Sequence, residues 1–298
     1  MPAGSHSDRS TAPVSYETRD GVSIVTLTRP SVLNALNTEL AAALVDAVER
    51  AETDATTYAV VVRGAGRAFC SGMDRTALAA GAIGEPFYRF WIRALNRLED
   101  MAKVSIAVLH GYSIGGGLQL AVACDLRLAT ADAVLGLGAS RHGIIPDGSV
   151  LRLARLIGLA RAKELSLLNP EVTADTARAI GLVTRVCAPG DVETALRAML
   201  DELRHQAPTA NGHIKRLLHE SFHADPRARI EDVLRAQDDC MRSWETAEAN
   251  RAWHDKREPV YDPGSRGTGS RGTGSRGTEP AGSRGTEPGP TSNRPPTP

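Results

Sequence analysis

Aromatic residues and paired cysteines are scarce in this chain of 298 residues. Phe, Trp and Tyr make up 4% of it, too few to predict a platform for stacking rings. Its four cysteines, Cys70, Cys124, Cys187 and Cys240, lie far apart and form no CxxC pair. Because a zinc site or a disulfide framework needs cysteines at close, regular spacing, the sequence predicts neither a metal site nor a disulfide, and a reducing cytoplasm is the simplest compartment.

Net charge and long apolar runs are also missing. The 35 lysines and arginines balance 35 acidic residues, so bulk electrostatics predict neither a nucleic-acid nor a membrane-surface partner. No apolar run approaches the roughly 20 residues that cross a bilayer, and the first 13 residues hold no hydrophobic stretch of a secretory signal. What is present, 42% hydrophobic residues, is enough for a full core. The composition therefore predicts an ordinary soluble protein of the cytoplasm.

The two ends of the chain differ from its body in composition. Residues 262–298 contain Gly-Ser-Arg-Gly-Thr four times, starting at Gly264, Gly269, Gly274 and Gly282. With almost no apolar residues this tail cannot offset the entropy of ordering, so we expect it to be disordered. It is either an idle appendage or, through its arginines, a weak tether to an acidic partner. Residues 1–13 are expected to form a flexible N-terminal segment.

Within the body, short β-rich runs alternate with helical periodicities. Strands are predicted at residues 22–28, 58–62, 104–109 and 126–129, and helices at residues 38–51, 87–98 and 118–124. This alternation is typical of an α/β fold. Beyond Val150 the pattern is almost entirely helical through Trp253. We therefore expect a core over residues 14–200, with the catalytic parts in its first half, and a helical region over residues 201–261.

A run of three glycines, Gly115 to Gly117, separates a predicted strand from a predicted helix. Backbone without side chains at a helix start exposes unpaired N–H groups and the positive end of the helix dipole. Such a turn can bind an anion or a developing oxyanion. A second glycine-bearing turn, residues 63–74, follows the strand predicted at residues 58–62. By itself it predicts only a tight turn or a weak phosphate site, since the GxGxxG pattern is incomplete.

Both turns belong to a set of segments that carry a family resemblance. The segments are RPSVLNALN (29–37), RGAGRAFCSGMD (63–74), HGYSIGGGLQLAVACDLRLAT (110–130), RHGIIPDG (141–148) and AKELSLLNPEVTADTARAIGLVTRV (162–186). In order and spacing they resemble the crotonase, or enoyl-CoA hydratase/isomerase, superfamily over about residues 14–253. The resemblance implies a crotonase-like spiral of ββα units and a C-terminal helical region that assembles a homotrimer or hexamer. It also implies an acyl-CoA thioester as substrate and no separate cofactor, because coenzyme A is part of the substrate.

The resemblance also assigns roles to backbone groups in the two turns. The N–H groups of Met73 and Gly116 match the oxyanion hole that holds the thioester carbonyl in this family. Ala35, Ser71 and Met73 match positions along the path of the CoA moiety, and Gly115 and Gly116 lie against the bound thioester. Gly116 is expected to resist replacement because a Cβ would enter the space of the carbonyl.

The acid and base choose the reaction, and here the sequence departs from typical hydratases. Hydratases of the family use two glutamates that flank a water molecule. This chain has Gln119 at the position of the first and Ala139 at the position of the second. Glutamine can orient a water molecule by hydrogen bonds but does not titrate, and alanine does neither. Hydration by two glutamates is therefore not expected.

Asp147 is the remaining candidate base. In the segment Ile144 to Gly148 it matches the single acidic residue of the family's enoyl-CoA isomerases, where one carboxylate takes the α-proton and returns it to the γ-carbon. Burial in an apolar pocket would raise its pKa toward the operating pH. The alternative interpretation is structural, since Pro-Asp-Gly favours a turn and Asp147 could cap the helix near Val150.

Other polar residues leave further interpretations open. His142 lies in the same loop and is either a solvent-facing histidine or an acid or base. With Gln119 or His142 involved, another CoA-enolate reaction is possible, such as decarboxylation, C–C hydrolysis or atypical hydration. A catalytically silent protein that binds acyl-CoA is the third hypothesis. Asp125 is expected to be structural, and Asp74 to cap a helix.

Overall fold

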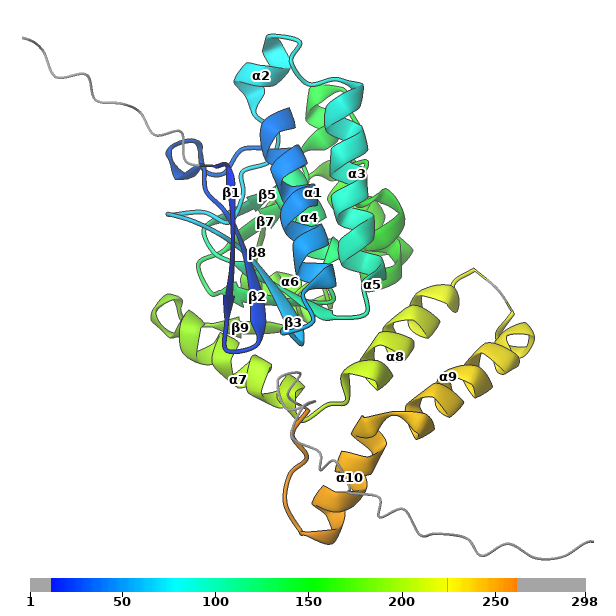
Figure 1. Cartoon of the computed structure of the whole chain (residues 1–298). Coiled ribbons are helices and arrows are strands. Elements are labelled where there is room, and N and C mark those ends of the chain that lie inside the picture. The colour runs from blue at the N-terminus through cyan, green and yellow to red at the C-terminus, as the bar shows by residue number, and fades with distance from the viewer. Residues whose placement is uncertain (1–11, 224, 262–298) are drawn as a thin grey trace, which may run out of the picture. The chain divides into compact units, whose positions relative to one another are not determined.

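A six-stranded sheet forms the centre of the computed structural model, which describes residues 12–223 and 225–261 (Figure 1). In sheet order its strands are β1 (Val14–Arg19), β2 (Val22–Leu27), β3 (Ala59–Gly64), β4 (Val104–Leu109), β6 (Leu126–Thr130) and β9 (Arg185–Cys187). Strand β1 is antiparallel to β2, and the four following pairs are parallel. A smaller sheet contains β5 (Tyr112–Ile114), β7 (Val134–Gly136) and β8 (Val172–Thr173). The predicted α/β fold is therefore confirmed.

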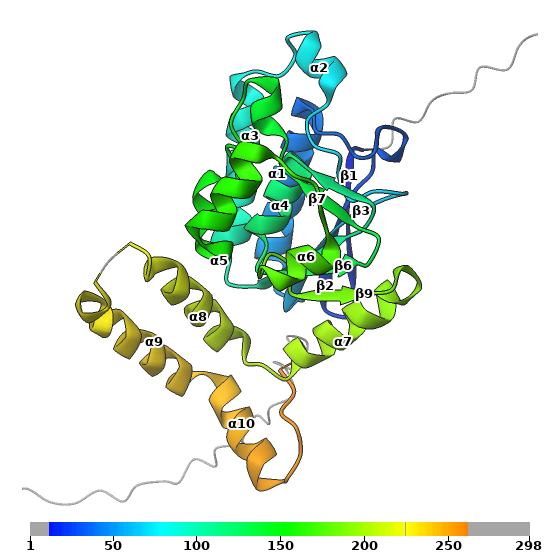
Figure 2. The ribbon, with the colours of Figure 1, turned by 180° about the vertical axis from the view of Figure 1, so that it is seen from behind.

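Ten helices and several single helical turns connect these strands in the described part of the chain. The helices are α1 (Thr38–Thr53), α2 (Arg75–Ala79), α3 (Glu85–Asp100), α4 (Gly116–Ala123), α5 (Val150–Lys163), α6 (Ala174–Ala179), α7 (Val192–Arg204), α8 (Pro208–Glu220), α9 (Ile230–Arg242) and α10 (Trp244–His254). The helical turns are η1 (Pro30–Val32), η2 (Ala139–His142), η3 (Glu164–Leu168), η4 (Pro189–Asp191) and η5 (Pro226–Arg229). Helices α1 and α3 lie side by side in both views (Figures 1 and 2).

Both faces of the large sheet are buried over its inner strands, which explains their nearly continuous apolar sequences. In β4, Ala107 and Leu109 join the core that contains α1, α3 and α4, whereas Ile106 and Val108 face a second cluster. That second cluster includes Leu196 and Met199 of α7. Because side chains alternate along a strand, the inner strands β2, β3, β4 and β6 each contribute to both cores. The two-sided burial fixes the carboxyl ends of β3 and β4, which lead into the turn of residues 65–74 and into the short strand β5 before the glycine run.

Local sequence signals account for the helix starts nearest the glycine turns. The side chain of Asn37 accepts a hydrogen bond of 2.9 Å from the Leu40 N–H and so caps α1. Asp74 accepts from the N–H groups of Thr76 and Ala77 and caps α2, as expected from the sequence. Each cap satisfies N–H groups that have no partner inside the helix.

A largely buried acid, Asp125, links the C-terminal helices to the sheet. The Asp125 carboxylate accepts hydrogen bonds from the Ser105 N–H and hydroxyl in β4, at 2.8 and 2.9 Å. It also pairs at 2.8 Å with the ammonium of Lys215 in α8. Lys215 additionally donates to the carbonyls of Leu98 and Lys103. The structural role expected for Asp125 is thus confirmed.

The prediction for the second half of the chain was partly wrong. Residues beyond Val150 are not almost entirely helical, because β8 and β9 lie there and β9 completes the large sheet. Helix α7 also continues to Arg204, past the expected boundary at residue 200, since Leu196 and Met199 pack on the sheet. The described residues all fall in one compact unit. The predicted tail and residues 1–11 of the N-terminal segment lie outside the described residues.

Candidate active site

The glycine run forms the turn into α4. Gly115 adopts φ 55° and ψ −119°, a backbone conformation that residues with a side chain rarely adopt. Its N–H donates to the Gly136 carbonyl of β7 at 2.8 Å, which anchors the turn. Gly116 is the first residue of α4 and its N–H finds no backbone acceptor among the described residues. The helix therefore begins with a free donor at its positive end.

Parallel pairing brings the second turn against the first. The Cys70 N–H donates to the Tyr112 carbonyl, and the Ile114 N–H donates to the Cys70 carbonyl, both at 3.0 Å. Gly72, with φ 92°, lies so close that a Cβ on it would be 3.5 Å from the Gly116 nitrogen and 2.9 Å from the Ile114 carbonyl oxygen. Glycine at position 72 thus lets the two turns meet.

The backbone of Met73 is left with a free donor by this arrangement. Leu36 forms a parallel bridge with Met73 in which the Leu36 N–H donates to the Gly72 carbonyl and the Asp74 N–H donates to the Leu36 carbonyl, both at 2.8 Å. Neither bond uses the Met73 N–H, and no described backbone carbonyl accepts it. Two free N–H groups from adjacent turns can together stabilise an oxygen on which negative charge develops.

Glycine at position 116 is required by close packing. A Cβ there would lie 2.2 Å from Cδ1 of Leu36, whose side chain is buried and lines the cavity in front of the turns. That a Cβ would also enter the space of a bound carbonyl stays a prediction. At Gly117 a Cβ would lie 2.2 Å from the Cys70 carbonyl oxygen. Close packing between the two turns therefore requires both glycines.

A cavity of about 330 Å³ opens in front of the two turns. Its walls come from α2, α3, the two turns and the loop that follows β7. Phe87 and Trp91 of α3 stack in its wall with ring centroids 6.1 Å apart. The other residues that line it are Leu36, Ser71, Gly72, Met73, Arg75, Leu78, Ala79, Tyr88, Ile114, Gly115, Gly116, Gln119, Leu137, Gly138, Ala139, His142, Ile144, Ile145 and Asp147. The lining is mostly apolar, and Asp147 is its sole carboxylate among the described residues.

The Asp147 side chain is available for chemistry. Its Oδ2 is buried and has no hydrogen-bond partner among the described residues. Burial raises the pKa of Asp147, and the backbone amides of Gly148 and of Asp147 itself oppose the increase. The residue lies in a turn, but Ser149 is the N-cap position of α5 and α5 has no side-chain cap. The capping interpretation of Asp147 is therefore wrong.

Gln119 is engaged with the backbone beside Asp147. It is 5% exposed, and its Oε1 accepts a hydrogen bond of 2.6 Å from the Gly148 N–H. No described residue accepts from its Nε2. Ala139, at the second hydratase position, is buried in the cavity wall and offers no polar atom. The oxygen of Gln119 thus holds the loop that carries Asp147.

The structure brings most of the predicted site residues together. Ser71, Met73, Gly115, Gly116, Gln119, His142 and Asp147 all line the cavity. His142 also has an exposed side chain, as expected of a loop histidine. Ala35 does not line this cavity; its carbonyl accepts a hydrogen bond from the Arg29 guanidinium. The proposed role of Ala35 on the CoA path stays a prediction.

Sequence reasoning missed other parts of the cavity wall. Leu36 and Leu137 lie next to named residues but belong to an ordinary apolar pattern, so no local signal marks them. The short strand β7, which places Leu137, has only three residues and lacks a recognisable period. Phe87 and Trp91, spaced four residues apart in a predicted helix, offered a signal for a shared apolar wall.

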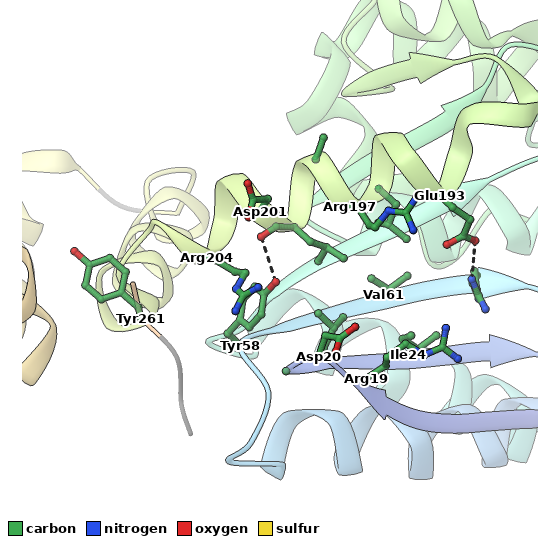
Figure 3. Close-up of a pocket in the computed structure, with 16 residues that line it drawn as sticks. Arg19, Asp20, Ile24, Tyr58, Val61, Glu193, Arg197, Asp201, Arg204 and Tyr261 are labelled. Atoms are coloured by element: carbon green, nitrogen blue, oxygen red, sulfur yellow. Dashed lines mark hydrogen bonds and ion pairs between the residues drawn. The ribbon is translucent and has the colours of Figure 1, made fainter. Parts of the chain in front are cut away.

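A larger cavity of about 790 Å³ lies between α7 and the outer face of the sheet (Figure 3). Its walls carry both signs of charge, including Arg197, Asp201 and Arg204 of α7 and Asp20 beside β2. An ion pair of 3.0 Å joins Glu193 to Arg63 at its edge. No residue of the glycine run lines it. Met73, Gly116 and Asp147 do not line this larger cavity, so it lacks the two free backbone donors and the carboxyl of the smaller one.

Residues 12–223 and 225–261 contain neither a cluster of metal ligands nor a membrane-spanning helix. They contain no group of three or more His, Cys, Asp or Glu side chains that could hold a metal ion. No helix among them is both long and apolar enough to cross a membrane.

Comparison with known proteins adds the family. The profile described as enoyl-CoA hydratase/isomerase matches residues 17–264. YngF of Bacillus subtilis (strain 168) is 33% identical over 245 residues, which cover 80% of this chain and 94% of YngF. The short-chain-enoyl-CoA hydratase of Clostridium acetobutylicum is 29% identical over 249 residues, covering 82% of this chain and 95% of the relative.

Solved structures agree with the sequence relatives. An enoyl-CoA hydratase/isomerase from Marinobacter aquaeolei has a TM-score of 0.77 and 30% identity, and the match covers 83% of this chain and 98% of that one. An enoyl-CoA hydratase from Mycobacterium smegmatis has a TM-score of 0.77 and 27% identity, covering 84% and 98%. The crotonase-like fold expected from the sequence is confirmed.

Proposed function

The chain belongs to the enoyl-CoA hydratase/isomerase family, and from this premise we propose that it moves a double bond of an acyl-CoA thioester from the β,γ to the α,β position. The observation that supports this reaction most directly is Asp147, the one carboxylate among the described residues that line the cavity. Asp147 combines a buried oxygen without a partner with a raised pKa, both suited to a group that takes a proton and returns it.

The proposed steps use groups on two sides of the cavity. The thioester carbonyl accepts hydrogen bonds from the N–H groups of Met73 and Gly116, which acidifies the α-carbon. Ionised Asp147 removes the α-proton, and the resulting dienolate keeps its negative charge on the oxygen held by the two donors. Protonated Asp147 then delivers the proton to the γ-carbon. Loss of one such donor typically costs about 2.7–4 kcal/mol of barrier.

The chemistry of the reaction supports the absence of a further cofactor. The double bond moves without a net change in oxidation state, and one proton leaves and returns. A single carboxylate and two backbone donors can supply these steps. We therefore propose that coenzyme A, as part of the substrate, is the one non-protein group that the reaction needs.

Hydration is less well supported, although several relatives are named hydratases. Addition of water by two carboxylates requires a second acid in the cavity, and none of the described lining residues besides Asp147 supplies one. The Gln119 oxygen, which could hold a water molecule, already accepts from the Gly148 N–H. Isomerisation requires neither a second carboxylate nor proton transfer by Gln119.

Incubation with 3-enoyl, 2-enoyl and 3-hydroxyacyl CoA esters tests the proposal. We expect the 3-enoyl esters to gain the ultraviolet absorbance of a conjugated thioester, and Asp147→Asn to lower kcat by about 10³-fold or more while CoA-ester binding persists. Asp132→Asn, an exposed acid outside the cavity, is the matched control. Hydration of 2-enoyl esters by the wild type, or full activity of Asp147→Asn, would overturn the proposal.

We further propose that the protein assembles through its helical region, as a homotrimer or hexamer. Helices α8 and α9 present exposed apolar side chains that water disfavours, including Ile214, Leu218, Val233 and Leu234. Light scattering coupled to size-exclusion chromatography would give the mass directly. A monomer at micromolar concentration would contradict this assembly.

A further inference from the structure

The residue after Asp147, the proposed base, is Gly148, and its conformation is fixed by side chains of neighbouring helices. Gly148 has no side chain, so its own backbone does little to restrict the direction in which Asp147 points. It packs tightly: a Cβ there would lie 2.4 Å from Leu95 Cδ1 and 2.7 Å from the Gln119 Oε1. The orientation of Asp147 therefore depends on what holds the two peptide groups of Gly148.

A side chain from a neighbouring helix forms a hydrogen bond with each of these peptide groups. The Gly148 N–H, in the peptide bond to Asp147, donates to Gln119 at 2.6 Å. The Gly148 carbonyl, in the following peptide bond, accepts from Nη1 of Arg152 at 2.8 Å. No other described residue donates to that carbonyl. Two bonds from different helices, α4 and α5, thus clamp the single residue beside the base.

Arg152 is itself held in place by α3. Its Nε donates to Glu99 Oε2 at 2.7 Å, and its Nη2 donates to Asn96 Oδ1 at 2.7 Å. The side chains of Arg152 and Glu99 are only 12% and 17% exposed. A planar guanidinium can serve three acceptors in fixed directions, which a lysine ammonium on its flexible stem does less well. Arg152 therefore links α3 to the loop that carries Asp147 through hydrogen bonds at both ends.

Helix α3 also forms part of the wall of the cavity in front of the glycine turns, through Phe87 and Trp91. Asp147 lines both that cavity and a second one, of about 710 Å³, in which Arg152 and Glu99 lie. Asp147 thus lies between the cavity in front of the glycine turns and the ion pair of Arg152 with Glu99.

We propose that Arg152, held by Glu99 and Asn96, is a positioning residue that acts with Gln119 to orient Asp147 for proton transfer. This inference rests on the proposed function for its catalytic consequence, whereas the clamp itself is a property of the fold. Proton transfer depends steeply on distance, so release of one end of Gly148 lowers turnover more than substrate binding.

The test compares two arginines of α5 that share Glu99. Arg155 lies 3.8 Å from Glu99 but makes no bond to Gly148. We expect Arg152→Met to lower kcat with a 3-enoyl-CoA by about 10- to 100-fold with KM within about threefold, and Arg155→Met to change kcat less than twofold. Arg152→Lys should recover part of the loss. Equal losses in both Met variants, or an unchanged kcat in Arg152→Met, would overturn the inference.

Hydrogen exchange of the peptide that covers residues 144–153 tests the clamp without turnover. We expect faster exchange in Arg152→Met than in the wild type or Arg155→Met. If the wild type fails to isomerise 3-enoyl-CoA, the proposed function fails and this measurement alone decides the inference: unchanged exchange in Arg152→Met overturns it. Should Arg152→Met not fold because Glu99 is left buried and unpaired, the double variant Arg152→Met/Glu99→Met removes both charges and serves in its place.

Discussion

The candidate site has two halves, one formed by backbone N–H groups and the other by the side chain of Asp147. The half proposed to bind the carbonyl consists of backbone N–H groups, placed by strand pairing and by glycines that let two turns touch. The half proposed to move the proton consists of one side chain on a loop, placed by hydrogen bonds from two helices. Backbone donors define a class of chemistry, since any CoA thioester can use them, whereas the side chain selects the reaction within it.

Substitution at Gly116 is expected to damage the backbone half most. Gly116→Ala places a methyl group against Leu36 and displaces the N–H, so we expect kcat to fall by about 10²- to 10³-fold, the usual effect of losing one oxyanion donor. Steady-state kinetics would measure it. The double variant Leu36→Ala/Gly116→Ala, which makes room for the methyl group, should regain part of the activity. Gly116→Ala with nearly full activity would show that this N–H does not contact the carbonyl.

Substitution at Gln119 is expected to affect the side-chain half less. Gln119→Ala removes the acceptor of the Gly148 N–H and leaves that buried donor unpaired, which typically costs about 1–3 kcal/mol. We expect kcat to fall about tenfold and thermal stability to decrease. Gln119→Glu keeps the acceptor but adds a negative charge beside Asp147, which raises the pKa of the base. Its pH–rate profile should therefore rise at higher pH than that of the wild type, and an unshifted profile would argue against proximity of the two groups.

The pH dependence of stability tests the environment of Asp147 without substrate. Because its pKa is raised in the folded state, the folded protein favours the protonated form, and this stabilisation is lost as pH rises from the unfolded value of about 3.9 through the folded one. Asp147→Asn is neutral at every pH. Its melting temperature should therefore exceed that of the wild type at pH 8 by more than at pH 4. An equal difference in melting temperature at pH 4 and pH 8 would mean that burial does not raise the pKa of Asp147.

The smallest effect is expected on the other face of the sheet. Glu193→Gln breaks the ion pair with Arg63 at the edge of the larger cavity, where Glu193 is 63% exposed. Exposed pairs contribute about 0–1 kcal/mol, so activity should stay within twofold and the melting temperature nearly unchanged. A large loss of turnover would show that the larger cavity, and not the one beside the glycine turns, takes part in the reaction.

The sequence predicted the backbone half of the site better than the side-chain half. Glycines at strand ends mark close approaches locally, and the predicted strands and helices around them were confirmed. The bond between Gln119 and Gly148 joins residues 29 positions apart and depends on how α4 packs against the next loop. Arg152 reads as an ordinary polar residue of a helix until Asn96 and Glu99 are seen beside it. Strand β9, with three residues, is too short for a periodic signal.

The tie between Asp125 and Lys215 decides where the chain can be shortened. A truncation before α8 would remove Lys215 and leave a largely buried carboxylate with two hydrogen bonds but no counter-charge. Breaking one partner from a buried pair costs about 3–5 kcal/mol, a large share of the stability of most domains. We therefore expect the α/β portion to lose stability without α8, and a minimal fragment for expression should retain that helix.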